Sequence, residues 1–180
     1  MVTDRRTDAQ SFETLAMPMF ASLYNFAYWL TQNREEAEDL VQETYLKALK
    51  GFASFQQGTN LRAWMYRILR NTFLTSRTGL RAKMTEPLDL DDDPAALPVT
   101  SDTPESVLLT RADQQAVQDA LERLPVRFRE VILLCDMEEM SYQEIAEALA
   151  VPIGTVMSRL SRARKSMREL LAAQVQGASK

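Results

Sequence analysis

The 180-residue sequence contains no histidine and one cysteine, Cys135. The lack of histidine excludes histidine-based catalytic triads, most general acid–base schemes and most zinc sites. One cysteine cannot form an internal disulfide, which favours a cytoplasmic location. The glycine-rich phosphate-binding loops GxGxxG and GxxxxGK[ST] are also missing. These absences argue against an enzyme, and we expect neither a metal site nor a cofactor.

Glycine and long apolar runs are scarce as well. Five glycines, together with many Leu, Ala, Glu and Arg residues, predict a helical chain with few tight hairpins. No apolar run approaches the roughly 20 residues that a membrane span needs. The N-terminal sequence MVTDRRTDAQ lacks the apolar core of a signal peptide. We therefore expect an all-α protein that does not insert into a membrane by itself.

Charge is distributed in blocks, although the net charge is only −4. Residues 44–85 contain eight basic residues and no acidic one, and residues 153–168 contain five basic residues and no acidic one. Between these blocks, residues 86–105 contain seven acidic residues and no basic one. The pattern predicts two small helical domains, 10–84 and 106–175, joined by a flexible acidic linker over 85–105.

Apolar residues at helical spacing indicate the helices of the first domain. Asn33 is the expected N-cap of a helix over 34–49, and Gly51 its stop. A strongly basic helix is expected over 61–77, ended by Gly79. The apolar positions that should face the core are Phe12, Leu15, Met19, Leu23, Phe26, Leu30, Ala37, Leu40, Val41, Thr44, Ala48 and Leu49.

The second domain contains a helix-turn-helix pattern after an apolar helix over 128–137. Ser141 and Glu144 form a capping box at the start of a short helix, and Pro152 opens the next one. That helix should pack on Val156, Leu160, Ala163 and Met167. Its opposite face presents side chains able to reach a DNA major groove: Thr155, Ser158, Arg159 and Arg162, with Arg164 and Lys165 extending the positive surface. A solvated basic helix is the alternative interpretation.

Three segments resemble conserved regions of the bacterial extracytoplasmic-function sigma factors, in the order usual for that family. The segment that resembles the region reading the promoter −35 element is SYQEIAEALAVPIGTVMSRLSRARKSMREL. The segment that resembles the region binding core RNA polymerase is NREEAEDLVQETYLKALKGF. The segment that resembles the region opening and reading the −10 element is GTNLRAWMYRILRNTFLTSRTG. The resemblance covers about residues 10 to 175 of this sequence.

The resemblance implies roles for particular residues. Strand opening needs positive charge for phosphates and aromatic rings or polar pockets for an unstacked base. Trp64 is equally consistent with a place in the core, and Tyr66 and Phe73 are similarly ambiguous. The implied −10 residues are Gln56, Thr59, Asn60, Arg62, Trp64, Arg67, Arg70, Asn71 and Arg77. Ser161 joins the −35 set, where its lack of charge, like that of Met157, leaves the sequence preference open.

The resemblance also implies partners, namely core RNA polymerase, promoter DNA and an anti-sigma protein, in a stress response. The implied polymerase-binding residues are Glu38, Asp39, Leu40, Gln42, Glu43 and Lys47. An ordinary solvated acidic face is the alternative for that set. For the whole chain, the alternatives are a helix-turn-helix regulator that binds duplex DNA alone and an enzyme acting on nucleic acid. The first leaves the basic, aromatic segment 62–77 unexplained, and the missing histidines count against the second.

Overall fold

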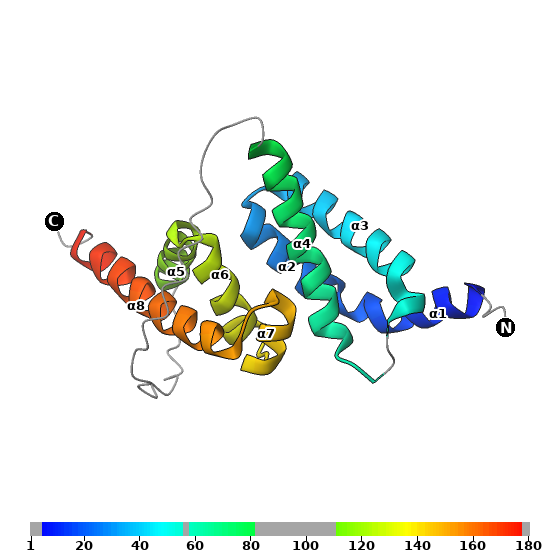
Figure 1. The fold of residues 1–180 in the computed structure, drawn as a ribbon. Helices are drawn as coiled ribbons and strands as arrows, with labels where there is room; N and C mark the ends of the chain where they lie inside the picture. The colour runs from blue at the N-terminus through cyan, green and yellow to red at the C-terminus, as the bar shows by residue number, and fades with distance from the viewer. Residues whose placement is uncertain (1–4, 56–57, 82–110, 178–180) are drawn as a thin grey trace.

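The computed structural model describes residues 5–55, 58–81 and 111–177, and every regular element in these ranges is helical. The first half of the chain forms α1 (Arg5–Ala16), η1 (Met17–Met19), α2 (Phe20–Thr31), α3 (Arg34–Gly51), η2 (Phe52–Ser54) and α4 (Leu61–Arg81). The second half forms α5 (Arg111–Arg123), α6 (Val126–Ile132), the π-helical η3 (Leu133–Met137), α7 (Tyr142–Leu149) and α8 (Ile153–Gly177). The all-α expectation with two helical domains is confirmed, and the expected linker lies outside the described residues (Figure 1).

Local sequence signals start and stop the helices of the first half. The Asn33 side chain accepts a hydrogen bond from the Glu36 amide (3.1 Å), so the predicted N-cap of α3 is confirmed. Pro18 lies in η1, the short 3-10 segment between α1 and α2. Gly79, expected to end α4, lies inside that helix, which continues to Arg81. A glycine near the end of a helix therefore did not mark its boundary here.

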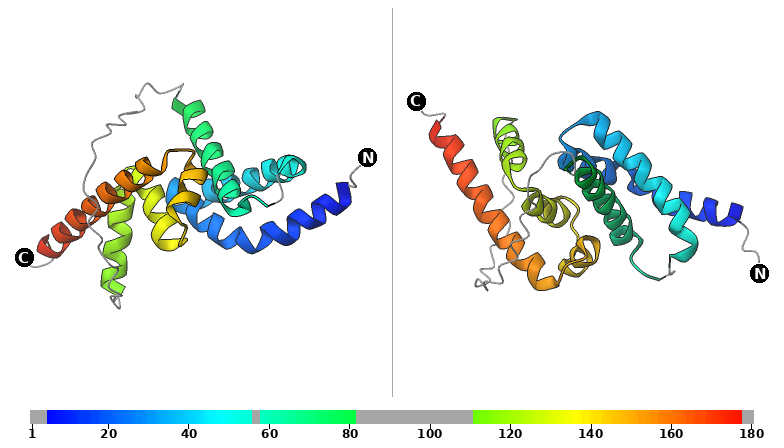
Figure 2. Two further views of the ribbon diagram at one scale, coloured as in Figure 1. Left: turned by 60° about the horizontal axis from the view of Figure 1, so that its bottom comes forward. Right: turned by 45° about the horizontal axis from the view of Figure 1, so that its top comes forward.

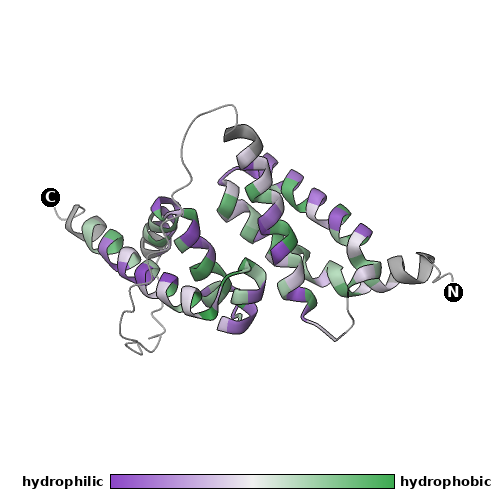
Figure 3. Ribbon diagram, in the orientation of Figure 1, coloured by the Kyte–Doolittle hydropathy of each residue, from purple (hydrophilic) through white to green (hydrophobic). Residues whose placement is uncertain are grey.

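The core of the first half follows the predicted apolar stripes with two exceptions. Most of the expected positions are buried. Hydrophilic and hydrophobic residues alternate along α3, as in an amphipathic helix (Figure 3). Leu15 and Leu49 are 53% and 44% exposed, so the expectation that they face the core is wrong. Both lie at the edge of their apolar stripes, where a helix turns its side chains back toward solvent.

In the second half, α8 packs against α5, α6 and α7, and α6 continues directly into η3. Val131, Ile132, Leu133 and Leu134 are all buried there, as the apolar pattern over 128–137 predicts. Met137, at the end of the π-helical turn, is 54% exposed and does not join that core. The chain then reverses at Glu139, whose φ of 52° lies in the left-handed region, before α7 begins.

The two halves pack directly against each other, α4 beside α7 and α2 beside α6. In all three views α1 and the last turns of α8 lie at opposite ends of the molecule, so the contact involves the middle elements (Figures 1 and 2). Buried Arg129 supports this contact from α6. Its guanidinium donates to the carbonyls of Leu121 and Glu122 in the last turn of α5, of Leu124 just after it, and of Trp29 in α2.

Candidate nucleic-acid and polymerase interfaces

The helix-turn-helix forms as the sequence predicts. Ser141 Oγ accepts a hydrogen bond from the Glu144 amide (3.2 Å), and Glu144 accepts one from the Ser141 amide (2.8 Å), which completes the capping box. Ala150 ends α7 in the left-handed region with a φ of 53°. Buried Leu149 and Val156 lie on either side of the turn and help to fix the angle between α7 and α8.

The side chains of α8 divide into an inner and an outer set. Val156, Leu160 and Ala163 are buried, as expected. The expected DNA-contacting residues Thr155, Ser158, Arg162 and Arg164 are half-buried, whereas Ser161 and Lys165 are exposed. Arg159 is turned inward: its side chain is 15% exposed and its Nη1 lies 3.6 Å from Glu130 Oε1. Arg164 donates to Asp136 (2.9 Å).

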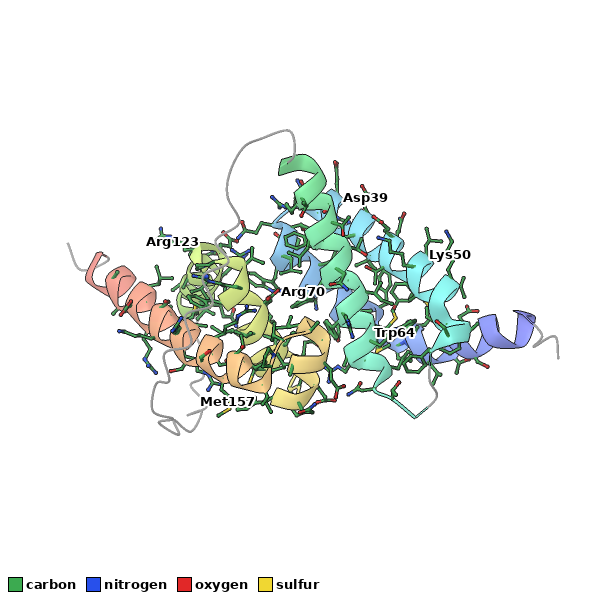
Figure 4. All side chains as sticks on the ribbon, viewed as in Figure 1. Asp39, Lys50, Trp64, Arg70, Arg123 and Met157 are labelled. Carbon is green, nitrogen blue, oxygen red and sulfur yellow. The ribbon has the colours of Figure 1, made fainter. Side chains whose placement is uncertain are left out.

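Two apolar residues on the outer face of α8 were not selected from the sequence. Ile153 and Met157 are 45% and 37% exposed, and Figure 4 places Met157 near the start of α8. Ile153, Met157 and Ser161 follow one another at intervals of four residues, which puts all three on one face of the helix. The four-residue spacing alone predicts that these two apolar residues lie on the outer face, whereas charge and hydroxyl groups select only their polar neighbours.

The basic helix α4 begins at an Asn cap and carries both buried and exposed candidates. Asn60 Oδ1 accepts from the Ala63 amide (3.0 Å), while Arg67 and Asn71 are exposed. Tyr66 and Phe73 are 1% and 4% exposed, so in this conformation both belong to the core. Thr59 and Arg77 are exposed, and Gln56 lies outside the described residues.

The Trp64 side chain is partly packed in the core and partly open to solvent. Its ring contacts Phe55, with centroids 4.9 Å apart, and its Cζ2 atom is within 3.5 Å of the place where a Cβ on Gly51 would lie. One part of the ring is therefore packed, while the side chain as a whole is only half-buried. Figure 4 shows Trp64 on the lower part of α4.

Three expected −10 residues contact the second half of the chain. The Asn60 amide donates to Glu144 Oε1 (2.6 Å), and Arg62 Nη2 lies 2.8 Å from Glu138 Oε2. Arg70 is bidentate on Glu130, with Nε–Oε2 of 2.8 Å and Nη2–Oε1 of 3.1 Å. In Figure 4 Arg70 is labelled where α4 faces the second half. Arg62, Asn60 and Arg70 thus form one line of polar contacts between the halves.

Burial strongly affects the ionisable groups along this line. Burial raises the pKa of Glu130, and Arg70 and Arg159 oppose that shift because they favour the carboxylate. Burial also raises the pKa of Tyr66, and the neighbouring Glu138 carboxylate adds to the effect by disfavouring a phenolate. The Tyr66 hydroxyl therefore stays protonated, and the charge at this contact comes from arginines and carboxylates.

The expected polymerase-binding residues lie on α3. Glu38, Asp39, Gln42 and Glu43 are exposed, and Figure 4 shows Asp39 on the outer side of the helix. Lys47 is paired with Glu43 (2.6 Å) and donates to Thr72 (3.2 Å). Leu40 is 6% exposed, so its side chain packs in the core and positions the helix.

The exposed surface of α3 is also apolar at its C-terminal end. Leu46 and Leu49 are 58% and 44% exposed beside the acidic residues. Sequence reasoning did not select Leu46 and assigned Leu49 to the core. An apolar centre with a polar rim is the usual make-up of a protein interface.

Neither a metal site nor a membrane span is found in the part of the chain that the structure describes. No group of three or more acidic or cysteine side chains there is arranged to hold a metal ion. The three consecutive acidic residues of the expected linker, Asp91–Asp93, lie outside the described residues. Within the same ranges, no helix is both long and apolar enough to cross a bilayer.

Known proteins resemble both halves of the chain. Sigma-70 region 2 matches residues 20–82, and Sigma-70 region 4 matches residues 114–167. The chain is 38% identical to the ECF RNA polymerase sigma factor EcfG of Rhodopseudomonas palustris, over 83% of this chain and 79% of that protein. It is 37% identical to the ECF RNA polymerase sigma factor SigE of Mycolicibacterium smegmatis, over 90% of this chain but only 62% of that longer protein.

A solved structure is similar to almost the whole chain. It is that of the sigma factor RpoE in complex with the anti-sigma factor NepR from Bartonella quintana. The TM-score is 0.71 at 32% sequence identity, and the match covers 91% of this chain and 98% of the other.

Proposed function

Because the chain belongs to the extracytoplasmic-function subfamily of the sigma-70 factors, we propose that it directs core RNA polymerase to promoters through contacts from both halves. Sigma factors are not enzymes, and this chain has no catalytic role in RNA synthesis. The observation that carries the proposal is the presence of both sigma regions in one chain, in order, with a capped helix-turn-helix in the second. The proposal assigns the polymerase-binding and −10 half to residues 10–84 and the −35 half to residues 106–175.

The second half reads the −35 element through the outer face of α8. Its half-buried or exposed polar residues can reach bases and phosphates in a major groove, where arginine is the commonest specific reader of guanine. Met157 can contact a thymine methyl group from the same face. Arg159 joins this set only after it leaves Glu130. The proposed −35 residues are Thr155, Ser158, Arg159, Ser161, Arg162, Arg164 and Lys165.

The first half opens the −10 element through α4 and the loop before it. Exposed Arg67 and Asn71 can hold phosphate and an unstacked base, because a single strand needs both charge and hydrogen-bonding groups. The half-buried Trp64 ring offers a stacking edge. The other proposed members are Gln56, Thr59, Asn60, Arg62, Arg70 and Arg77.

The outer face of α3 binds core polymerase. Its exposed carboxylates and amide, Glu38, Asp39, Gln42 and Glu43, supply charge and hydrogen bonds, and Leu46 supplies apolar area. Lys47 reaches this face through its ion pair with Glu43.

An anti-sigma factor controls the protein in a stress response in the cytoplasm. Support comes from the similarity over most of the chain to a sigma factor solved in complex with its anti-sigma factor. A cytoplasmic location follows from the need to meet polymerase and DNA.

Promoter-specific initiation tests the function. The full chain is mixed with core RNA polymerase and a library of genomic promoter fragments, and transcripts are sequenced at their 5′ ends. Transcripts that start at a defined set of fragments only when the chain is added support the proposal. No such transcripts, together with tight sequence-specific duplex binding by the chain alone, would indicate a helix-turn-helix regulator instead.

A further inference from the structure

The first two turns of α8 present apolar side chains to the outside. The exposed side chains there belong to Ile153 and Met157, which lie four residues apart on one face (Figure 4 labels Met157). The first charged residue of the helix, Arg159, points inward, and Ser158 Oγ donates to a backbone carbonyl of the same helix (3.1 Å). The outer surface at the start of α8 is therefore mainly apolar, although the helix as a whole is basic.

The backbone beside this apolar pair, Ile153 and Met157, is open as well. Gly154 is exposed in the first turn, and a Cβ there would meet no atom within 4 Å in the described part of the chain. Its φ is not in the left-handed region. Glycine is a poor helix former, and neither the backbone nor packing within the described residues requires it at this position. The glycine instead lets a second molecule come close to the helix backbone.

Charge identifies DNA as that second molecule. Residues 153–168 contain five basic residues and no acidic one. Exposed Lys165 and Arg168 follow the apolar pair along the same helix. In a helix-turn-helix the N-terminal residues of the second helix contact base edges, while phosphate contacts position the protein. The apolar pair therefore lies where bases are read, and the basic residues suit the flanking phosphates.

We propose that Ile153 and Met157 read thymine methyl groups in the major groove of the −35 element and thereby select A·T base pairs at those positions. The inference rests on the proposed function of the second half and names the base chemistry that this half recognises. Thymine offers an apolar group at its major-groove edge, the C5-methyl. Guanine and cytosine offer hydrogen-bonding groups there, which an apolar side chain would cover without pairing. The apolar pair thus favours thymine and disfavours G·C pairs.

The spacing of the two side chains limits which thymines they reach. Four residues of α-helix rise about 6 Å, and successive base pairs lie about 3.4 Å apart, so the two thymines should lie within about two base-pair steps of each other. Ile153 is β-branched and stiff, whereas Met157 is unbranched and flexible. The thymine read by Ile153 is therefore the more strictly placed of the two.

Removal of single methyl groups from the DNA tests the inference. Each thymine of the −35 element, on either strand of a promoter from the initiation library, is replaced in turn by deoxyuridine, which lacks only the C5-methyl. The full chain, bound to core RNA polymerase, is mixed with the labelled unmodified promoter, and each modified duplex competes for it. We expect one or two replacements to weaken binding about fourfold each, the loss for one buried methyl group. The other replacements should leave the affinity unchanged.

Variants of the full chain assign each methyl group to a side chain. Met157→Ala should abolish the sensitivity to deoxyuridine at one thymine, and Ile153→Ala at the other, because the contacting side chain is gone. The matched control is Met137→Ala, since Met137 is 54% exposed but lies at the end of η3, outside α8, and both sensitivities should remain. Circular dichroism shows whether each variant is folded. If an alanine variant is not, the glutamine variant at the same position decides by the same criterion.

The outcomes separate this inference from the proposed function. The inference is wrong if no deoxyuridine weakens binding, if the weakening persists in both alanine variants, or if the −35 element consists of G·C pairs alone. Alanine variants that lose affinity for core polymerase, with unchanged relative affinities for the duplexes, would show that the face binds protein and would also overturn it. Initiation is measured on the same unmodified promoter. Initiation without a methyl effect contradicts this inference alone, whereas absent initiation contradicts the proposed function and this inference with it.

Discussion

Replacing Arg129 by methionine should destabilise the second half strongly. Arg129 is 5% exposed and donates four hydrogen bonds, of 2.8, 2.8, 2.6 and 2.9 Å, to backbone carbonyls. Three of the carbonyls belong to the end of α5 or the residue just after it, where a helix leaves its last acceptors without intrahelical donors. Methionine retains a similar apolar stem but supplies no donor.

The expected loss can be estimated from these contacts. Hydrogen bonds to a charged group contribute about 1.5–3 kcal/mol each, but burial of the guanidinium, which lowers the pKa of Arg129, offsets part of their sum. Arg129→Met leaves four backbone carbonyls without this donor, and a buried acceptor without a partner costs about 1–3 kcal/mol. We therefore expect Arg129→Met to lower the free energy of unfolding by about 3–5 kcal/mol, a large fraction of the ~5–15 kcal/mol of a typical domain.

Urea denaturation followed by far-ultraviolet circular dichroism measures the loss. Hydrogen exchange of the α5 and α6 amides assigns it to the second half. The matched control is Arg127→Met on the same helix: Arg127 is half-buried and contacts only the Phe128 ring (5.2 Å) among its described contacts. A cation–π contact of this kind contributes about 0.5–1 kcal/mol. Equal losses in the two variants, below about 1 kcal/mol, would refute the assigned role of Arg129.

Three further predictions concern the DNA-contacting elements. Ser141→Ala removes the cap of α7 and should lower the free energy of unfolding by about 1 kcal/mol in the same denaturation assay; no loss would contradict the capping role. Ala150→Gly should raise stability by about 0.5–1 kcal/mol, because glycine relieves the left-handed backbone; a loss of stability would contradict this. In the presence of polymerase, Arg162→Ala should weaken binding to −35 duplex DNA by about 1–3 kcal/mol, whereas Asn71→Ala should impair promoter opening with duplex binding retained. Identical behaviour of these two variants in gel-shift and opening assays would show that the division of labour is wrong.

Features set by neighbouring residues were predictable from the sequence. The capping box at Ser141 and the cap at Asn33 depend on contacts three residues apart, so a short pattern specifies them. The buried stripe of α8 follows from helical periodicity in the same way. Periodicity also bears on Arg159, which lies three residues after buried Val156 and four before buried Ala163. Helical spacing therefore predicts that the Arg159 side chain faces inward, whereas its positive charge predicts that it faces solvent.

The contact between the halves was not predictable. Arg70 and Glu130 are 60 residues apart, and Asn60 and Glu144 are 84 apart, with the linker between. No local pattern relates such positions, because their meeting depends on how two separately folded units pack. A basic helix and scattered glutamates are each consistent with solvated surfaces, and only their placement shows that they pair. Tyr66 was ambiguous for the same reason, since its burial follows from packing against Phe26, 5.2 Å away between ring centroids.

Permanganate footprinting of a promoter, chosen from the initiation library, tests the central claim most directly. The account predicts that the full chain and core polymerase together make thymines near −10 reactive and protect the −35 region, while the chain alone does neither. Protection of the −35 duplex by the chain alone, with no reactive thymines when polymerase is added, would contradict it.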